Sequence, residues 1–227
     1  DLFTRLNIGK IPLTSSELVK ALFLRNSQDS IIQNRQEEIS LQWDNIERDL
    51  HDETFRAFLT NTPGEKYATR IDFLLDLMAG KTTEEKDDYY TFFYFDKMHK
   101  EGEDLYKIWE GIVHTFLTLK EWRYNHELYH KIGYLISCGE VSLGHIYQQS
   151  KSCTKKELKS YLNDEITRSI QFKIPYSELS YENHPTEIER LLLLFNIESV
   201  RTIDNNKQWF PFDKHKESHW SLEHIHA

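Results

Sequence analysis

The chain has 227 residues, of which 39% are hydrophobic and 29% charged, with a formal net charge of −9. This length and composition are typical of a globular protein with one good-sized domain or two small ones, and they exclude a repetitive or low-complexity chain. The acidic balance counts against direct nucleic-acid binding by this chain alone, because surfaces that bind nucleic acids are usually basic. With only 8 glycines and 5 prolines, the sequence favours long helices over a strand-rich fold.

Nothing in the sequence indicates a membrane or secreted protein. The longest aliphatic run, residues 191–195, is far shorter than the roughly 20 residues that a spanning helix needs. No N-terminal signal peptide is recognisable, and Cys138 and Cys153 do not form a C-x-x-C pair. We therefore predict a soluble, cytoplasmic protein with reduced thiols and no membrane partner. Because the chain lacks an initial Met and ends at Ala227 within an apparent motif, we interpret it as a piece of a longer protein.

The first half of the chain shows clear helical signals. A capping box at Thr14–Glu17 predicts the start of one helix. A second helix is expected from about Ser30 to Leu50, where apolar residues recur in steps of four, three and four. The N-T-P-G run at 61–64 breaks the chain. A third helix then covers 71–78, and Gly80 can end it.

The second half continues the helical pattern. The aromatic residues 89–95 could form a strand, but a helix or an irregular packed segment is favoured because the neighbouring segments are helical. Amphipathic patterns predict helices over 105–119 and 128–135. A second capping box at Thr154–Glu157 begins another helix, and Pro185 begins the last one.

After residue 196 the pattern changes. Residues 207–212 and 220–225 look extended, which predicts a short β hairpin. The predicted fold class is therefore mainly α, with a multi-helix, bundle-like body and a short C-terminal β hairpin. The alternative is one continuous helical domain followed by a disordered tail.

Two terminal segments carry possible chemistry. In the loop before the first helix, Arg5, Asn7 and Lys10 could contact phosphates, although a solvated loop with a helix cap also explains them and no P-loop is present. Near the other end, Glu223 followed by His224 suits metal-dependent phosphodiester hydrolysis. The carboxylate would hold Mg²⁺, and the imidazole would deprotonate the attacking water.

Histidines gather at the C-terminal end, with four of the 11 in the last 13 residues. The His215-x-x-x-His219 spacing could bind a metal on a helix, but a solvated loop is favoured because the flanking residues do not have a helical pattern. For His130, and for the large aromatic residues Trp43, Trp109, Trp122 and Tyr129, packing in the core is favoured over a ligand or catalytic role.

Three blocks together resemble the GmrSD-type, NTP-dependent DNA restriction endonucleases. Residues 3–18, F-x-R-L-N-x-G-K-x-P-L-x-x-x-E-L, look like the segment after the nucleotidase core of the family's ParB-like domain. Residues 210–213, with the later W-S-L-E-H-I-H-A, are similar to the opening of its HNH domain. The matching pieces of the helical region between them are 42–48, 69–74, 121–123, 129–136 and 191–196. The resemblance covers residues 2–227, and the blocks follow the family's order.

The resemblance implies three parts: residues 1–27 as the tail of the ParB-like NTPase domain, 28–200 as a helical middle domain, and 201–227 as the start of a truncated HNH nuclease domain. It implies that Arg5, Asn7 and Lys10 lie near a nucleotide, that Glu223 is the first metal ligand, and that His224 is the general base.

The whole protein would use Mg²⁺ and NTP and would cut modified DNA in phage defence. The family's D-G-Q-Q-R signature and the later residues of the HNH motif are absent from these residues. The chain itself is therefore expected to be inactive, with weak or no nucleic-acid binding and no bound cofactor, and to link the two modules. The alternative function is a non-catalytic helical module that recruits a protein partner.

Overall fold

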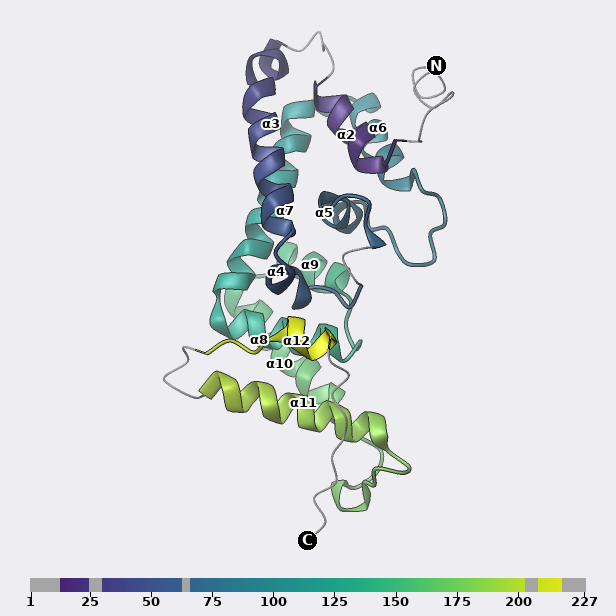
Figure 1. Ribbon diagram of the computed structural model, residues 1–227, viewed down its shortest axis with the longest axis vertical. Helices are drawn as coiled ribbons and strands as arrows, with labels where there is room; N and C mark the ends of the chain where they lie inside the picture. Colours follow the sequence, from purple (N-terminus) through teal and green to yellow (C-terminus); the bar gives the residue numbers. More distant parts are fainter. Residues whose placement is uncertain (1–12, 25–29, 63–65, 203–207, 218–227) are drawn as a thin grey trace. The chain divides into compact units, whose positions relative to one another are not determined.

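The computed structural model describes residues 13–24, 30–62, 66–202 and 208–217, and these residues form helices joined by loops, with no strand among them (Figure 1). The chain divides into two compact units. Within the described residues, the first unit comprises 13–24, 30–51 and 66–119, and the second comprises 52–62, 120–202 and 208–217.

The first unit contains α2 (Ser15–Leu24), α3 (Ser30–Leu50), α5 (Ile71–Ala79), α6 (Tyr90–Lys100) and α7 (Leu105–Tyr124) as far as Leu119. Both halves of the predicted capping box are present at α2, because the Glu17 amide donates to Thr14 Oγ1 at 3.2 Å and the Thr14 amide donates to Glu17 Oε2 at 2.8 Å. Gly80 follows α5 with a φ of 69° and ends the helix as predicted. The preference for a helix over a strand at 89–95 is confirmed by α6.

Aromatic side chains form the core of the first unit. The rings of Trp43 and Trp109 stack with centroids 5.9 Å apart, and Phe23 meets Trp109 edge-on at 5.6 Å. The indole N–H of Trp109 donates to Gln42 Oε1 at 2.7 Å, so the one polar atom of this buried side chain is satisfied. The prediction that Trp43 and Trp109 are core residues is confirmed.

The second unit contains α4 (Glu53–Ala57), α8 (His126–Ser137), α9 (Leu143–Ser152), α10 (Lys155–Ser169), the 3₁₀ helix η2 (Tyr176–Glu178), α11 (Pro185–Thr202) and α12 (Phe212–Glu217). Helix α8 is its central element: residues 128–136 are all buried, and α8 packs against both α10 and α11. The predicted capping box between Thr154 and Glu157 begins α10. Trp122 and Tyr129 are each 2% exposed, which confirms them as core residues.

The prediction of a C-terminal β hairpin is wrong in its described half. Residues 208–211 have no regular secondary structure, and α12 begins at Phe212. The physical reason is that Phe210 and Phe212 are both buried by packing on helical residues, not in a sheet. The other half of the hairpin, residues 220–225, lies outside the described residues.

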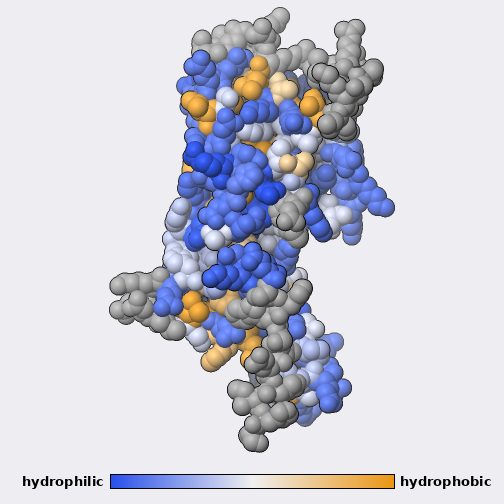
Figure 2. All heavy atoms as spheres, viewed as in Figure 1, coloured by the Kyte–Doolittle hydropathy of each residue, from blue (hydrophilic) through white to orange (hydrophobic). Residues whose placement is uncertain are grey.

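The surface agrees with the acidic, polar composition. In the face shown in Figure 2, hydrophilic residues cover most of the described surface, and apolar residues form small separate groups. None of the described helices combines the length and the apolar character that crossing a membrane requires.

Candidate functional site

The candidate site lies in the second unit, where residues 208–217, hereafter the docked segment, cross helix α8. The segment begins with Gln208-Trp209-Phe210-Pro211 and continues as α12. The side chains of Phe210 and Phe212 are 1% and 0% exposed. Burying two phenyl rings stabilises such an attachment by about 1.5–3 kcal/mol each relative to exposed rings. A short irregular segment is thus held by its side chains rather than by a sheet.

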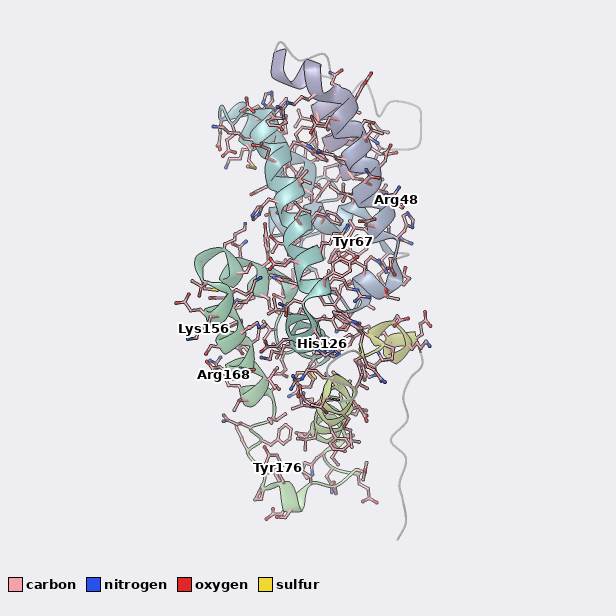
Figure 3. All side chains as sticks on the ribbon, turned by 90° about the vertical axis from the view of Figure 1, so that its left-hand side faces the viewer. Arg48, Tyr67, His126, Lys156, Arg168 and Tyr176 are labelled. Carbon is pink, nitrogen blue, oxygen red and sulfur yellow. The ribbon has the colours of Figure 1, made fainter. Side chains whose placement is uncertain are left out.

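Side chains of α8 also satisfy the backbone of the docked segment. The Phe210 amide donates to His130 Nε2 at 3.1 Å, and the Tyr129 hydroxyl donates to the Phe210 carbonyl oxygen at 2.8 Å. At the N-terminal end of α8, His126 Nε2 donates to the Gln208 carbonyl oxygen at 2.7 Å. Figure 3 labels His126 at the start of this helix. Buried backbone groups need such partners, and for Phe210 the side chains of Tyr129 and His130 take the place of a neighbouring strand.

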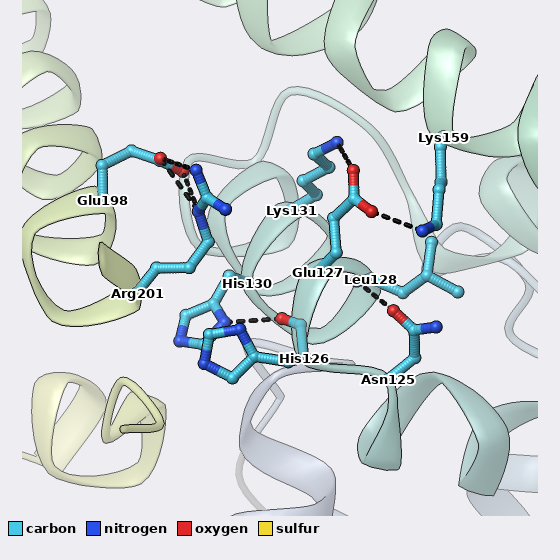
Figure 4. A network of polar contacts seen from close by, with 9 residues as sticks. All are labelled: Asn125, His126, Glu127, Leu128, His130, Lys131, Lys159, Glu198 and Arg201. Carbon is cyan, nitrogen blue, oxygen red and sulfur yellow. Dashed lines mark hydrogen bonds and ion pairs between the residues drawn. The ribbon is translucent and has the colours of Figure 1, made fainter. Parts of the chain in front are cut away.

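His130 is fixed in one tautomer by this arrangement. Its side chain is buried, and its Nδ1 lies 2.6 Å from the carbonyl oxygen of His126, which can only accept (Figure 4). Nδ1 therefore carries the proton, and Nε2 has the free lone pair that accepts from the Phe210 amide. Burial lowers the pKa of His130 to about 4. The predicted packing role is confirmed, and the imidazole is neutral at physiological pH with both nitrogens engaged.

Gly133 allows the docked segment to lie directly on α8. A Cβ atom at this position would be 2.2 Å from both Cε2 and Cζ of Phe212. Real atoms do not approach so closely, so any other residue would have to displace the ring or the helix. Phe212 is also enclosed by Phe210 and Tyr129, with ring centroids at 4.9 and 5.2 Å. The absence of a side chain at Gly133 thus creates the seat for this ring.

Trp209 and Arg123 form the outer edge of the contact. Trp209 is 36% exposed and meets Tyr129 edge-on, with ring centroids 4.9 Å apart. The guanidinium carbon of Arg123 lies 4.9 Å from the Tyr129 ring centroid and 5.1 Å from that of Trp209. A cation over two aromatic faces is favourable by about 0.5–1 kcal/mol or more for each ring. Arg123 therefore helps to hold Trp209 beside α8.

The far end of the docked segment is attached to α4. The Lys216 ammonium donates to the Ala57 carbonyl oxygen, and to that of Thr60 at 2.9 Å. These carbonyls lie at and just beyond the C-terminal end of α4, where such groups lack partners inside the helix. Burial lowers the pKa of Lys216 to about 7. The docked segment is thus anchored at both ends.

Ion pairs surround α8 without taking part in the docking (Figure 4). Glu127 is paired with Lys131 and with Lys159 of α10. Burial favours a higher pKa for Glu127, but the hydrogen bonds from the two lysines outweigh it and lower the pKa below its ordinary value. On α11, Arg201 Nε lies 3.0 and 2.9 Å from the two carboxylate oxygens of Glu198. Of these pairs, Glu127–Lys159 links α8 to α10, whereas Glu127–Lys131 and Glu198–Arg201 each lie within one helix.

The residues predicted to carry chemistry lie elsewhere in the chain. Arg5, Asn7 and Lys10 precede the described residues, and Glu223 and His224 come after them, so the structure does not show whether either set comes together. His215 lies in α12 with its ring 5.9 Å from that of Phe210, while its suggested metal partner His219 is outside the described range. The described part of the chain contains no group of three side chains suited to hold a metal.

The arrangement is therefore suited to holding the docked segment on α8. His130 cannot act as a base for a substrate, because both of its nitrogens are bonded to backbone groups. The site fixes the chain up to Glu217, six residues before Glu223. The sequence contained a signal for this site in the run 129–136, but it did not indicate which segment α8 binds.

Comparisons with protein-family models, curated proteins and solved structures gave no match for this chain.

Proposed function

We propose that this chain is the helical part of a GmrSD-type, NTP-dependent and modification-dependent DNA restriction endonuclease that acts in the cytoplasm in phage defence. In that protein it links an NTPase module to an HNH module, and it is itself inactive. Glu223 serves as an Mg²⁺ ligand and His224 as the general base, since a carboxylate is the type of ligand that Mg²⁺ prefers. DNA is bound mainly by other parts of the protein, because this chain carries a net charge of −9.

The observation that carries the proposal is the order of the three resembling blocks, and the contact between two of them adds support. Residues 129–136 and 210–213 are far apart in the sequence, yet Tyr129 and His130 bind the backbone of Phe210, and Phe212 packs on Gly133. A nuclease motif that comes after Phe212 needs a fixed starting point in order to place its metal ligand and base. The docked segment supplies one on the helical part.

The first test is the complete reading frame. The proposal requires a D-G-Q-Q-R signature before these residues, and an Asn and a His of the HNH motif soon after Ala227. A stop codon directly after Ala227 would contradict it. The chain would then be better explained as a helical module that recruits a protein partner.

The second test uses the complete protein and two activities. We expect His224→Ala to abolish Mg²⁺-dependent cleavage of modified DNA while NTP hydrolysis continues, because the base is lost and the NTPase module is untouched. The matched control is His145→Ala, which changes a histidine in α9 of the second unit. Unchanged cleavage by His224→Ala would refute the assignment of the base.

The linking role needs a third variant. Tyr129→Phe removes the hydroxyl that donates to the Phe210 carbonyl oxygen without changing the shape of the ring. We expect slower DNA cleavage with NTP hydrolysis maintained, because the start of the nuclease module is held less firmly. If both activities always fell together in such variants, the idea that the helical part links nucleotide state to cleavage would lose its support.

A further inference from the structure

We propose that the docked segment, residues 208–217, is a pH-sensitive attachment: protonation of His130 is incompatible with its hydrogen bond from the Phe210 amide and so shifts the segment towards release from α8 while the other helices stay folded. This inference concerns the described residues alone and does not depend on the proposed function. It comes from the way in which both nitrogens of one buried imidazole are used.

The hydrogen bonds of His130 in the docked state require its imidazole to be neutral. Nδ1 donates to the His126 carbonyl oxygen at 2.6 Å, within the same helix, and this bond is compatible with either charge state. Nε2 accepts the Phe210 amide at 3.1 Å, and this bond requires a lone pair. A proton on Nε2 would place two N–H donors face to face. Protonation therefore opposes the contact with the docked segment and leaves the contact within α8 intact.

The surrounding charges do not favour an imidazolium. On α8 the nearest ring is that of His126, with centroids 4.3 Å apart, so a positive charge there would add repulsion. On α11, Glu198 is already bound by Arg201 at 2.9 Å. On α7, Arg123 brings another positive charge to the aromatic rings of the site. Burial and, on α12, the carboxylate of Asp213 raise the pKa of Tyr129, whose ring centroid lies 5.1 Å from that of His130.

Release of the segment also requires the loss of its attachments outside α8: Arg123 lies over the Trp209 ring, and Lys216 donates to two carbonyl oxygens at the end of α4. Besides the His130 bond, the segment is held to α8 by the Tyr129 and His126 hydrogen bonds and by the burial of Phe210 and Phe212. Helix α8 keeps its own contacts with α10 and α11 when the segment leaves. The backbone of the segment forms no sheet and no long helix whose hydrogen bonds would oppose its release.

The direction of the pH effect depends on whether His130 binds its second proton more tightly in the docked or in the released state. Burial lowers the pKa of His130 to about 4 in the docked state. The exposed imidazole of the released state has an ordinary pKa of about 6.5. The released state therefore binds more protons between these values, and docking weakens as the pH falls from about 6.5 towards about 4. At about pH 5, the equilibrium constant for release is therefore about 30-fold larger than at about pH 7.5.

Hydrogen exchange of the Phe210 amide provides the test. After correction for the intrinsic exchange rate, we expect its protection to fall about 30-fold between about pH 7.5 and about pH 5. The amides of Ile132 and Leu135, in the buried core of α8, should keep their protection. A pH-independent Phe210 amide would overturn the proposal. An equal loss of protection throughout α8 would also overturn it, since that would be unfolding of the unit and not release of the segment.

Two matched variants identify the titrating group. His130→Gln keeps an acceptor for the Phe210 amide but cannot be protonated, so the acid-dependent loss of protection should disappear. His126→Gln changes the neighbouring histidine and should leave the acid response in place. A loss that persists in His130→Gln would refute the assignment. Should His130→Gln fail to fold, NMR titration of the His130 ring in the unaltered chain decides: titration near 6.5 with the segment docked overturns the proposal.

Discussion

Gly133→Ala is the sharpest test of how the docked segment is seated. In an exposed helix interior this substitution stabilises by about 1 kcal/mol, because glycine is a poor helix former. Here the added Cβ would be 2.2 Å from two atoms of the Phe212 ring, and the ring is fully buried. Overpacking a filled core costs about 1–3 kcal/mol. If the segment instead left its site, the loss would be bounded by the cost of exposing the Phe210 and Phe212 rings, about 3–6 kcal/mol.

We therefore expect Gly133→Ala to lower the free energy of unfolding by up to about 2 kcal/mol after the gain in helix propensity is subtracted. Denaturant unfolding followed by circular dichroism measures this change. Gly111→Ala in α7 is the matched control, because its Cβ would lie 3.8 Å from Met78 Cε, an ordinary contact. The control should raise stability by up to about 1 kcal/mol.

A second substitution separates the clash from other effects of the new methyl group. In a chain that already carries Phe212→Ala, the ring is absent and Gly133→Ala should be neutral or stabilising. The double-mutant cycle should therefore give a coupling of about 2 kcal/mol between the two positions. If Gly133→Ala stabilised the unaltered chain as much as Gly111→Ala does, the close packing of Phe212 on α8 would be refuted.

Three further changes probe the second unit by denaturant unfolding. Tyr129→Phe should lower the free energy of unfolding by about 1 kcal/mol, because the Phe210 carbonyl loses its donor. The control Tyr161→Phe should leave it unchanged, since the Tyr161 hydroxyl is buried without a partner among the described residues. Equal effects of the two substitutions would refute this prediction. Thr154→Ala should cost about 1 kcal/mol through loss of the cap of α10, and no change would contradict the capping box. Lys216→Met should cost about 1–2 kcal/mol, because two carbonyls at the end of α4 lose a donor, and a neutral result would count against this anchor.

Local signals made much of the helical fold predictable. Thr14 and Thr154 each precede a glutamate by three residues, and both capping boxes are formed. Such signals depend on neighbours in the sequence, so no knowledge of the tertiary fold is needed. The apolar steps over Ser30–Leu50 predicted α3 for the same reason. Gly80 was identified as a helix end because few other residues adopt its positive φ.

The elements that the sequence did not reveal depend on distant partners. Residues 207–212 were predicted to be extended, but in the described part of this run Phe210 and Phe212 are buried and α12 begins at Phe212. Helix α12 has only six residues, too few to show a periodicity. The short α4 and α9 were also missed, although Asp52 and Ser142 cap them in the structure. Local propensity is weak in such segments, and tertiary packing decides their structure.

The candidate site was predictable only in part for the same reason. His130 was correctly interpreted as a packing residue from its position among core residues, but its partner lies 80 positions later. Gly133 showed only that a helix contained a glycine, and the close approach of Phe212 appears only in three dimensions. The predicted chemical residues Glu223 and His224 come from family resemblance, and they stay predictions because they lie outside the described residues.

The docked segment also bears on how the two proposals can be separated. If this chain supports a nuclease module, the Tyr129 and His130 contacts matter because they fix the point from which that module continues, and weakening them should slow DNA cleavage more than it lowers stability. If the chain recruits a protein partner instead, the same contacts serve only to complete the core around Phe210 and Phe212, and stability alone should change. The acid response of His130 is expected in both cases, because it depends only on a neutral imidazole that accepts the Phe210 amide. A change in cleavage with His130 protonation in the complete protein would therefore connect the attachment to catalysis, whereas release without such a change would leave the attachment as a property of the fold.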